Sequence, residues 1–492
     1  MTTRITPVLK ISVALIASFV LFGVLFPDQL EASLSATQSF MFETFGWYFQ
    51  IIVTSFFIFS VYLALSKYGN ITLGDPGEKP EFSRPVWFAM LFSAGIGIGL
   101  FFYGVSEPVA HFSSPPQGEG GGPGDVVGGV TYTWINWGIY AWSVYAIVAL
   151  ALALQQFRYK APGLFSTTLR PVLGKSMNGP WGNAVDIVAV FATLFGVAAS
   201  LGLGSQQINS GLNYLFDIPI NPWIQLVIMS VITVIFVTSA TTGIQRGIKY
   251  LSTLNITISG MFLLFMFIVG PTLFLLNTFV SSLAHYAQVM VPMALRMSPV
   301  DAQEAAWTQA WTIFYWAWWI SWTPFVGMFI ARVSRGRTIR EFIFGVIFAP
   351  SLVTFFWFAV VGGNGIYLEL YDGINISGQP LETALFNVLE YLPFSALVSV
   401  LTMFILVIFF VTTADSATFV LGMQTSGGDL NPSIRIKVLW GFIFVAATSI
   451  LLFAGGLGAF QTMIVISALP LSVIMILMAI GIMKVLGQEK TP

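Results

Sequence analysis

The chain contains no cysteine and only two histidines in 492 residues. Without cysteine there are no disulfides, thiolate metal sites or cysteine nucleophiles. Charged residues are also few, because 20 Lys and Arg and 21 Asp and Glu make up 8% of the chain, whereas soluble proteins carry roughly 25%. This shortage excludes a water-soluble protein. The net charge of −1 gives no reason to expect a nucleic-acid partner.

Hydrophobic residues take the place of the missing charges, at 56% of the chain and a mean hydropathy of +0.84. A bilayer core needs roughly 20 apolar residues per helix, and about twelve stretches meet this length. They lie at 9–26, 42–66, 86–110, 130–157, 182–213, 221–242, 251–276, 304–331, 340–362, 392–422, 434–454 and 458–484. The run 56–65 is apolar on every face, unlike a barrel strand. We expect an all-α polytopic membrane protein.

The charges between these stretches predict the orientation, because Lys and Arg collect in cytoplasmic loops. With the N-terminus inside, 19 of the 20 basic residues fall in inner segments and only Arg296 lies outside. Acidic residues such as Asp28 and Glu31 collect in the outer loops. We therefore expect twelve transmembrane helices in the lipid bilayer of the plasma (inner) membrane, with both termini in the cytoplasm.

Two segments between spans have the pattern of surface helices. Residues 277–298 mix apolar and polar residues at helical spacing, as in an amphipathic helix at the outer interface. Residues 380–391 predict a second, shorter surface helix. The glycine-rich stretch 118–125 has no Gly-Lys-Ser/Thr ending, so we interpret it as an external loop and not as a phosphate-binding loop.

The third span contains three alternating glycines, Gly95, Gly97 and Gly99. Each interior glycine costs a helix on the order of 1 kcal/mol relative to alanine. This pattern favours unwound backbone in mid-membrane, which must line a cavity or be buried in protein. Gly95 and Gly99 also form a GxxxG pair, so close helix packing is the alternative.

Aromatic residues are concentrated in the eighth span, where eight of the sixteen residues from Trp307 to Trp322 are aromatic against 15% in the whole chain. Helical spacing predicts two aromatic faces, Tyr315, Trp318, Trp319 and Trp322 in this span and Trp134, Trp137, Trp142 and Tyr145 in the fourth. With almost no carboxylates between them, such rings suit a quaternary ammonium group, which they attract by roughly 0.5 to 2 kcal/mol per ring. Core packing is the alternative.

The tenth span carries Thr412, Thr413 and Asp415 at membrane depth. Together with backbone carbonyls, hydroxyls and a carboxylate suit a small hard cation. Bonding of the hydroxyls to their own helix is the alternative. The glycines, the aromatic faces and the hydroxyl pair together predict a cation-driven carrier for a quaternary ammonium compound.

At these residues the sequence resembles the betaine/carnitine/choline transporter family, and the likeness covers essentially the whole chain. The motifs that carry it are FSAGIGIGLFFYGVSEP (92–108), the set Trp137, Trp142 and Tyr145, FATLFGVAASLGLG (191–204), WTIFYWAWWISWTPFVGMFIARVSRGRTIREF (311–342) and FFVTTADSAT (409–418). The eighth-span motif is highly specific to this family.

The resemblance implies a homotrimer whose protomers transport independently, each with a 5+5 inverted repeat preceded by two extra helices. The expected units are two N-terminal helices (1–85), a first five-helix repeat (86–276), an external amphipathic helix (277–303), a second repeat (304–485) and a short cytoplasmic tail (486–492). Many osmoregulated relatives have long charged tails, so we expect no osmosensing of that kind here.

The resemblance also implies a substrate site. The ammonium group is expected in a cage of Trp137, Trp142, Tyr145 and Trp319, with Trp318, Trp322 and Phe314 guarding the path. The remaining substrate-binding residues are expected to be Ala94, Gly95, Ile96, Gly97, Gly99 and Asp415, with the unwound backbone of residues 94–99 meeting the carboxylate. Gly99 favours a zwitterion, because choline-transporting members tend to carry Asp at that position.

Sodium sites are implied in the same way. One maps onto carbonyls of Ser93, Ile96 and Phe409 and hydroxyls of Thr412 and Thr413. A second would comprise Thr193 and Phe325, but Val197 stands where the family has a further threonine and cannot bind a cation, which leaves the sodium stoichiometry open.

We therefore expect sodium-coupled uptake of glycine betaine or a related quaternary ammonium or sulfonium zwitterion, an osmoprotectant, by alternating access. Choline or carnitine uptake, sodium-independent carnitine/butyrobetaine exchange and a passive channel are the alternatives. Apart from Na⁺ as coupling ion, no cofactor is expected. A membrane enzyme is not expected either, because we place His111 and His285 in external loops, away from any buried carboxylate.

Overall fold

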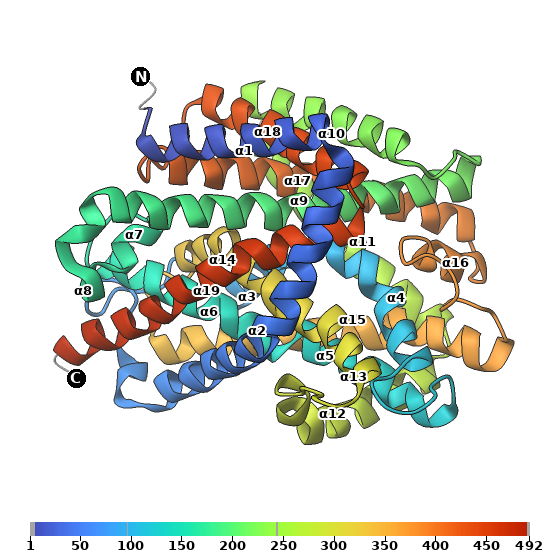
Figure 1. The fold of residues 1–492 in the computed structure, drawn as a ribbon. Coiled ribbons are helices and arrows are strands. Elements are labelled where there is room, and N and C mark those ends of the chain that lie inside the picture. Colours follow the sequence, from blue (N-terminus) through green and yellow to red (C-terminus); the bar gives the residue numbers. More distant parts are fainter. Residues whose placement is uncertain (1–4, 96, 243–244, 490–492) are drawn as a thin grey trace.

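The computed structural model describes residues 5–95, 97–242 and 245–489 and is built from helices (Figure 1). The only β contact within these ranges is an isolated bridge between Thr72 and Thr338. Nine helical stretches of the described chain are long and apolar enough to cross a membrane. The predicted all-α polytopic membrane fold is confirmed.

Each predicted span corresponds to one helix or to a pair of helices. In chain order these are α1 (Pro7–Leu25), α2 (Pro27–Leu65), α3 (Arg84–Gly95) with α4 (Ile98–Ser113), α5 (Val126–Trp137) with α6 (Ile139–Ala153), α9 (Pro180–Phe216), α10 (Pro222–Thr242), α11 (Gln245–Val269), α14 (Phe314–Val333), α15 (Ile339–Asp372), α17 (Ser395–Thr425), α18 (Ile434–Phe453) and α19 (Leu457–Gln488). Of the two predicted surface segments, 277–298 overlaps α12 (Thr272–Ala294), which begins five residues earlier, and 380–391 contains α16 (Ala384–Glu390).

The second helix is longer than the sequence predicted. α2 begins at Pro27, so Asp28 and Glu31, which we placed in an outer loop, lie near its start. Proline at the first helical position and an acidic residue in the first turn both favour a helix start. The predicted start at residue 42 was wrong because hydropathy detects apolar runs, and the first part of α2 is helical but too polar to form one.

The third span is interrupted at its glycines. α3 ends at Gly95 and α4 begins at Ile98, with Gly97 extended between them (φ −144°, ψ −159°). Because Gly97 has no side chain to cap α4, the first N–H groups of this helix have no side-chain cap. The N-terminus of α4 therefore presents partial positive charge inside the protein.

The fourth span is interrupted at Gly138, which the sequence did not predict. A Cβ at this position would lie 2.5 Å from Cε1 of Phe355 and 2.6 Å from the carbonyl oxygen of Trp134, so no larger residue fits without a shift. Trp134 stacks on Phe355 of α15 at a centroid distance of 4.4 Å. The predicted aromatic face is thus wrong for Trp134, which takes part in core packing.

The eighth span contains a π-helical turn, η5 (Gln309–Ile313), between the short α13 (Ala302–Thr308) and α14. Within α14, Pro324 lacks the N–H that would bond to the carbonyl of Ile320. The hydroxyl of Thr323 donates to that carbonyl instead, at 2.7 Å. This bond gives the carbonyl of Ile320 a partner where α14 passes Pro324.

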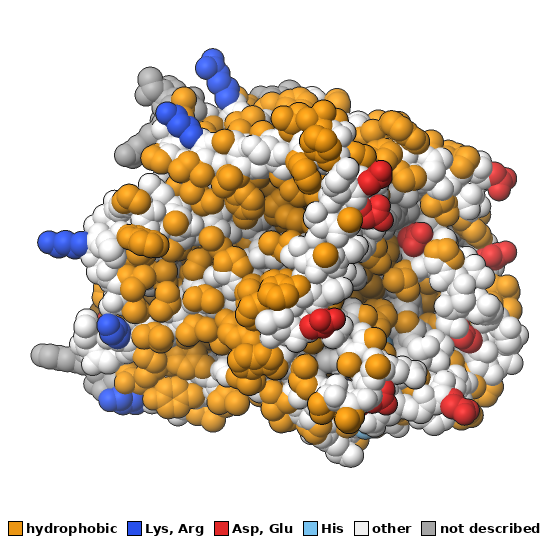
Figure 2. Space-filling view, in the orientation of Figure 1, with side chains coloured by type: hydrophobic (Ala, Val, Ile, Leu, Met, Phe, Trp, Pro, Cys, Tyr) orange, Lys and Arg blue, Asp and Glu red, His pale blue; other side chains and the backbone are white. Residues whose placement is uncertain are grey.

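Charge is segregated between two ends of the molecule. On the face drawn in Figure 2, Lys and Arg project from one end and Asp and Glu from the other. At the first end Arg158, in the π-helical turn η3 (Leu154–Arg158), donates to the carbonyl of Thr72 at 3.3 Å and to both carboxylate oxygens of Glu489, after α19. We call this the basic end and the opposite one the acidic end.

Candidate functional site

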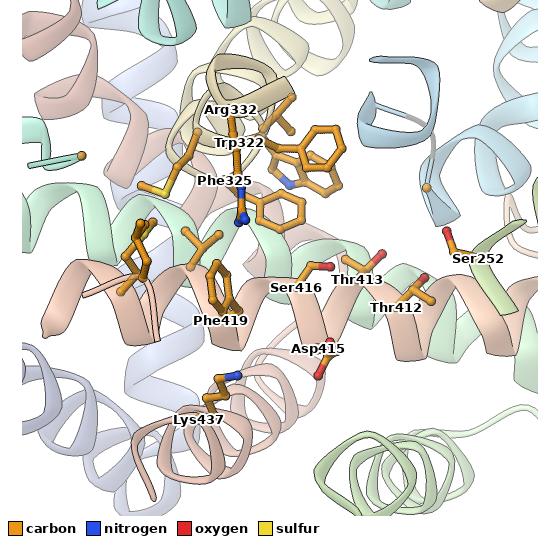
Figure 3. A pocket seen from close by; sticks show the side chains of 18 of the residues that line it. Ser252, Trp322, Phe325, Arg332, Thr412, Thr413, Asp415, Ser416, Phe419 and Lys437 are labelled. Atoms are coloured by element: carbon orange, nitrogen blue, oxygen red, sulfur yellow. The ribbon is translucent and has the colours of Figure 1, made fainter. Parts of the chain in front are cut away.

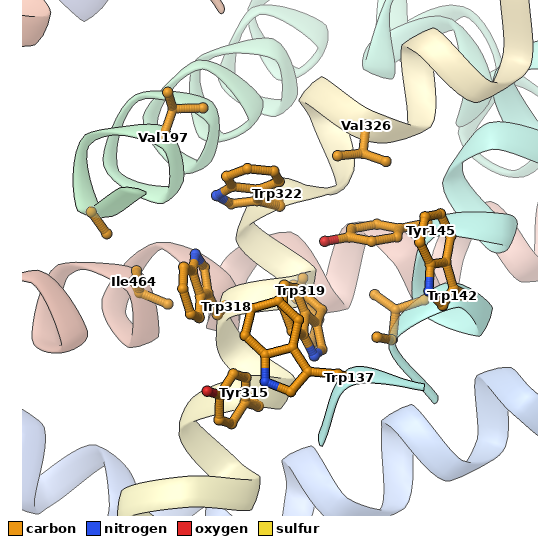
Figure 4. Packing of buried hydrophobic residues seen from close by; sticks show 14 of the residues in the cluster. Trp137, Trp142, Tyr145, Val197, Tyr315, Trp318, Trp319, Trp322, Val326 and Ile464 are labelled. Carbon is orange, nitrogen blue, oxygen red and sulfur yellow. The ribbon is translucent and has the colours of Figure 1, made fainter. Parts of the chain in front are cut away.

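Four aromatic residues from three helices meet in the interior (Figure 4). Trp137 ends α5, Trp142 and Tyr145 lie on α6, and Trp319 lies on α14. Ring centroids are 4.9 Å apart for Trp137 and Trp319, 6.1 Å for Tyr145 and Trp319, and 5.7 Å for Trp142 and Tyr145. We call these four residues the cage; they are the four that the family resemblance implies for the substrate's ammonium group.

The cage is closed on itself. Its rings are at most 6% exposed, and their centroid distances correspond to direct contact. Trp318 stacks on Trp319 at 5.3 Å with an interplanar angle of 6°, and Phe314 stacks on Trp318 at 5.4 Å. A methylated ammonium group can therefore enter only when the rings separate.

The indole N–H groups of α14 differ in their partners. Trp319 donates to the carbonyl of Asn136 at 2.7 Å, and Trp322 donates to the carbonyl of Gly196 at 2.7 Å. The N–H of Trp318 is buried and has no acceptor in the described part of the protein. Since buried donors are nearly always paired, this N–H is available to an acceptor on a ligand.

The break between α3 and α4 lies against the same rings. A Cβ at Gly99 would lie 2.9 Å from Cη2 of Trp137 and 3.4 Å from Cη2 of Trp318, and one at Gly97 would lie 3.8 Å from Trp322. The N-terminus of α4 and the aromatic residues therefore border one site. Of the other residues predicted for this segment, Ser93, Ala94 and Gly95 end α3, and Ile96 lies outside the described residues.

A cavity of about 390 Å³ is lined by Trp322 and Phe325 of α14, about one and two turns after the cage residue Trp319 (Figure 3). Its lining extends from Gly97 and Trp322, beside the cage, to Gly163 and Arg332. Gly163 follows the segment that contains Arg158, so the cavity leads toward the basic end.

Aromatic rings fill the space on the other side of the cage. Tyr103 of α4 is 2% exposed, and its ring centroid lies 6.0 Å from that of Trp137, 5.8 Å from that of Tyr315 and 5.9 Å from that of Trp318. Next to the cage the protein is thus packed on the Tyr103 side and hollow on the side of the basic end. A separate hollow, lined by Gln117, Asp125 and Tyr132, lies nearer the acidic end.

The predicted sodium ligands of the tenth span lie on the cavity wall. Thr412, Thr413, Phe409 and Asp415 all line the cavity from α17. The hydroxyl of Thr412 donates to the carbonyl of Ile408 at 2.9 Å and lies 3.2 Å from that of Phe409, so it bonds to its own helix. The described residues contain no cluster of three His, Asp or Glu side chains. A cation here would rest chiefly on hydroxyl and carbonyl oxygens.

The two residues predicted for a second sodium ion have different surroundings. The hydroxyl of Thr193 is buried on α9 and donates to the carbonyl of Ala189 at 2.7 Å, with Oε1 of Gln424 3.5 Å away. Phe325 lines the cavity and packs against Trp322. The carbonyl of Ala189 and Oε1 of Gln424 both accept, so they compete for the single hydroxyl proton of Thr193.

The sequence-based placement of His111 was wrong. α4 continues to Ser113, so His111 is helical and fully buried, with Nε2 3.2 Å from Oε1 of the buried Glu107. Glu107 also bonds to the cage residue Trp137. Its motif was quoted, but its role was missed; a carboxylate near the end of an apolar run was the available signal. His285 lies on α12.

The family model for betaine/carnitine/choline transporters matches residues 7–491. The chain belongs to this family. Members that resemble it include the glycine betaine transporter OpuD of Bacillus subtilis, 48% identical over 100% of this chain and 96% of that protein. The ectoine/hydroxyectoine transporter of Virgibacillus pantothenticus is 42% identical over 99% and 98% of the two chains. A probable glycine betaine transporter of Desulfitobacterium hafniense is 42% identical over 98% and 97%. As a member of the betaine/carnitine/choline transporter family, the chain is a multi-pass membrane transporter and not an enzyme.

Proposed function

We propose that the protein takes up glycine betaine, or a closely related quaternary ammonium or sulfonium zwitterion, as an osmoprotectant, by sodium-coupled symport. The observation that carries this proposal is the cage, in which Trp137, Trp142, Tyr145 and Trp319 converge from three helices. Ring faces attract a cation that has no proton to donate, and several rings together select for it. Two of the relatives named above are glycine betaine transporters by name, one of them a probable one.

The carboxylate of such a zwitterion would bind at the helix break. The N-terminus of α4 offers partial positive charge, and broken helices of transporters use such termini for anionic substrate groups. The unpaired N–H of Trp318 supplies a further donor beside Gly99. Ala94, Gly95, Ile96 and Gly97 would complete this part of the site, and Asp415 would contact the substrate on its way through the cavity.

The conformation supports release toward the basic end. Next to the cage the protein is packed on the Tyr103 side, while the cavity leads past Thr413 to Arg332. Because basic residues mark the cytoplasmic side of membrane proteins, we assign the basic end, with both termini, to the cytoplasm of a plasma membrane. Uptake by alternating access would then require a second state that opens at the acidic end.

Sodium would bind the oxygens of Ser93, Ile96, Phe409, Thr412 and Thr413, with Thr193 and Phe325 as a second site. We also propose a homotrimer and the 5+5 inverted repeat with the unit boundaries given above. Because the Thr412 hydroxyl bonds to its own helix, sodium-independent exchange of carnitine and butyrobetaine is the second candidate function.

Uptake of labelled glycine betaine into proteoliposomes, with and without an inward sodium gradient, tests the proposal. We expect accumulation only with the gradient, and equal rates would contradict the coupling. Competition by unlabelled ectoine, carnitine and choline ranks the substrates. Accumulation of ectoine in preference to betaine would indicate that the substrate is ectoine, as the name of the Virgibacillus relative states for that protein.

A further inference from the structure

A buried carboxylate lies directly behind the cage. Glu107 of α4 is fully buried, and its Oε2 accepts hydrogen bonds from Nε1 of Trp137 at 2.7 Å and from the hydroxyl of Tyr315 at 2.5 Å. Its Oε1 accepts one from Nδ2 of Asn136 at 2.7 Å and lies 3.2 Å from Nε2 of His111. The partners come from α4, α5 and α14, so one carboxyl group joins three helices.

These bonds make Glu107 hard to replace. A buried carboxylate is costly unless every oxygen is satisfied, and here Oε2 accepts from the indole of Trp137, which can only donate, while Oε1 accepts from the NH₂ group of Asn136. A glutamine would keep the size but remove the negative charge, and its NH₂ group cannot pair with the indole N–H of Trp137 or with the NH₂ of Asn136 as that amide is oriented. The site is therefore built for two acceptor oxygens.

The bond to Trp137 acts on the cage. Trp137 is the last residue of α5, immediately before the break at Gly138. The helix does not continue past Trp137, so no side chain of a following turn of α5 packs against its ring. Its N–H bond to Glu107 fixes the ring's rotation against Trp319, whose centroid is 4.9 Å away. A carboxylate that accepts from an indole N–H also increases the electron density of the ring, and this strengthens the attraction of its face for a cation.

We propose that Glu107 is a positioning residue that sets the affinity of the cage for the substrate's ammonium group by orienting and polarising Trp137. This role rests on the proposed function. It supplies the cage with negative charge without placing a carboxylate among the rings, so the cage can still reject ammonium groups that need a hydrogen-bond acceptor.

Uptake kinetics of glycine betaine in proteoliposomes test the role. Glu107→Gln is expected to raise KM by about tenfold with a smaller effect on the maximal rate, and Glu107→Asp to show a smaller rise. Replacing Trp137 with 3-benzothienylalanine keeps a bicyclic ring and removes only the N–H, so it should raise KM similarly. The doubly changed protein should resemble the more affected single one, because both changes break the same bond.

A matched control is Glu43→Gln, because Glu43 is exposed on α2 and should leave KM at the wild-type value. A wild-type KM for the folded Glu107→Gln protein, or effects that multiply in the double variant, would overturn the proposal. If Glu107→Gln does not fold, the test rests on the protein with 3-benzothienylalanine at position 137. An unchanged KM of that protein for glycine betaine would then overturn the proposed role of Glu107. Absence of betaine uptake by the wild type would instead contradict the proposed function, and the role of Glu107 with it.

Discussion

Trp322 of α14 donates its indole N–H to the carbonyl of Gly196 on α9, at 2.7 Å. The contact depends on the missing side chain, because a Cβ at position 196 would lie 2.8 Å from Cδ1 of Trp322 and 2.8 Å from Oγ of Ser321. Two long helices thereby approach closely at the end of the cavity that lies beside the cage.

Gly196→Ala is expected to displace Trp322 and to lower the free energy of unfolding by about 1 to 3 kcal/mol, the usual cost of overpacking. Thermal unfolding of the purified protein and betaine uptake measure the two effects. The control is Gly260→Ala on α11, where an added Cβ would meet no atom within 4 Å. Equal melting temperatures for the two variants would show that the close approach is not required.

Trp319→Leu should weaken glycine betaine binding by about tenfold, because the central ring of the cage is lost along with its cation–π attraction. Equilibrium binding to the purified protein gives the change. Trp181→Leu serves as the control, since Trp181 is 71% exposed on α9. An unchanged affinity of the Trp319→Leu protein for glycine betaine would contradict binding of the ammonium group in this cage.

Replacing both Thr412 and Thr413 with alanine is expected to raise the sodium concentration needed for half-maximal uptake by about tenfold or more, since two oxygen ligands are removed. Uptake is measured against external sodium at fixed membrane potential. Thr402→Ala is the matched control on α17, because the hydroxyl of Thr402 bonds only to the carbonyl of Val398. An unshifted sodium dependence would place the ion elsewhere.

The ion pair at the basic end predicts a pH dependence. Hydrogen bonds from Arg158 hold the pKa of the Glu489 carboxyl below its ordinary value of 4.5. A lowered carboxyl pKa stabilises the folded state above the ordinary value, and this stabilisation is lost as pH falls through the lowered pKa. Glu489→Gln should therefore cost about 1 kcal/mol at neutral pH and progressively less below pH 4.5.

Melting temperatures of wild type and Glu489→Gln, measured from neutral pH downward, test this prediction. Glu390→Gln, at an exposed position at the end of α16, is the control. A difference between wild type and Glu489→Gln that grows on acidification would have the wrong sign for this ion pair.

The spans could be predicted because hydropathy and loop charge are properties of each segment alone. All twelve stretches contain helices, and the break between Gly95 and Ile98 in the third one was signalled by its three glycines. The break at Gly138 could not be foreseen, since its cause is a contact with Phe355 on a helix more than two hundred residues away.

The residues of the cage were predicted through their aromatic spacing and the family resemblance. Glu107 and His111 were misjudged because the end of a membrane helix is not visible in hydropathy, and the partners of a buried carboxylate come from other helices. Burial of polar groups is decided by tertiary contacts, which a single sequence does not display.

The break at Gly138 separates α5 from α6 and so places the cage residues of the fourth span on two different helices. Trp137 belongs to α5, whereas Trp142 and Tyr145 belong to α6. The ring contacts of the cage therefore depend on the angle between α5 and α6, and we expect a change of this angle to move Trp137 relative to Trp142 and Tyr145 without any change in their side-chain torsions.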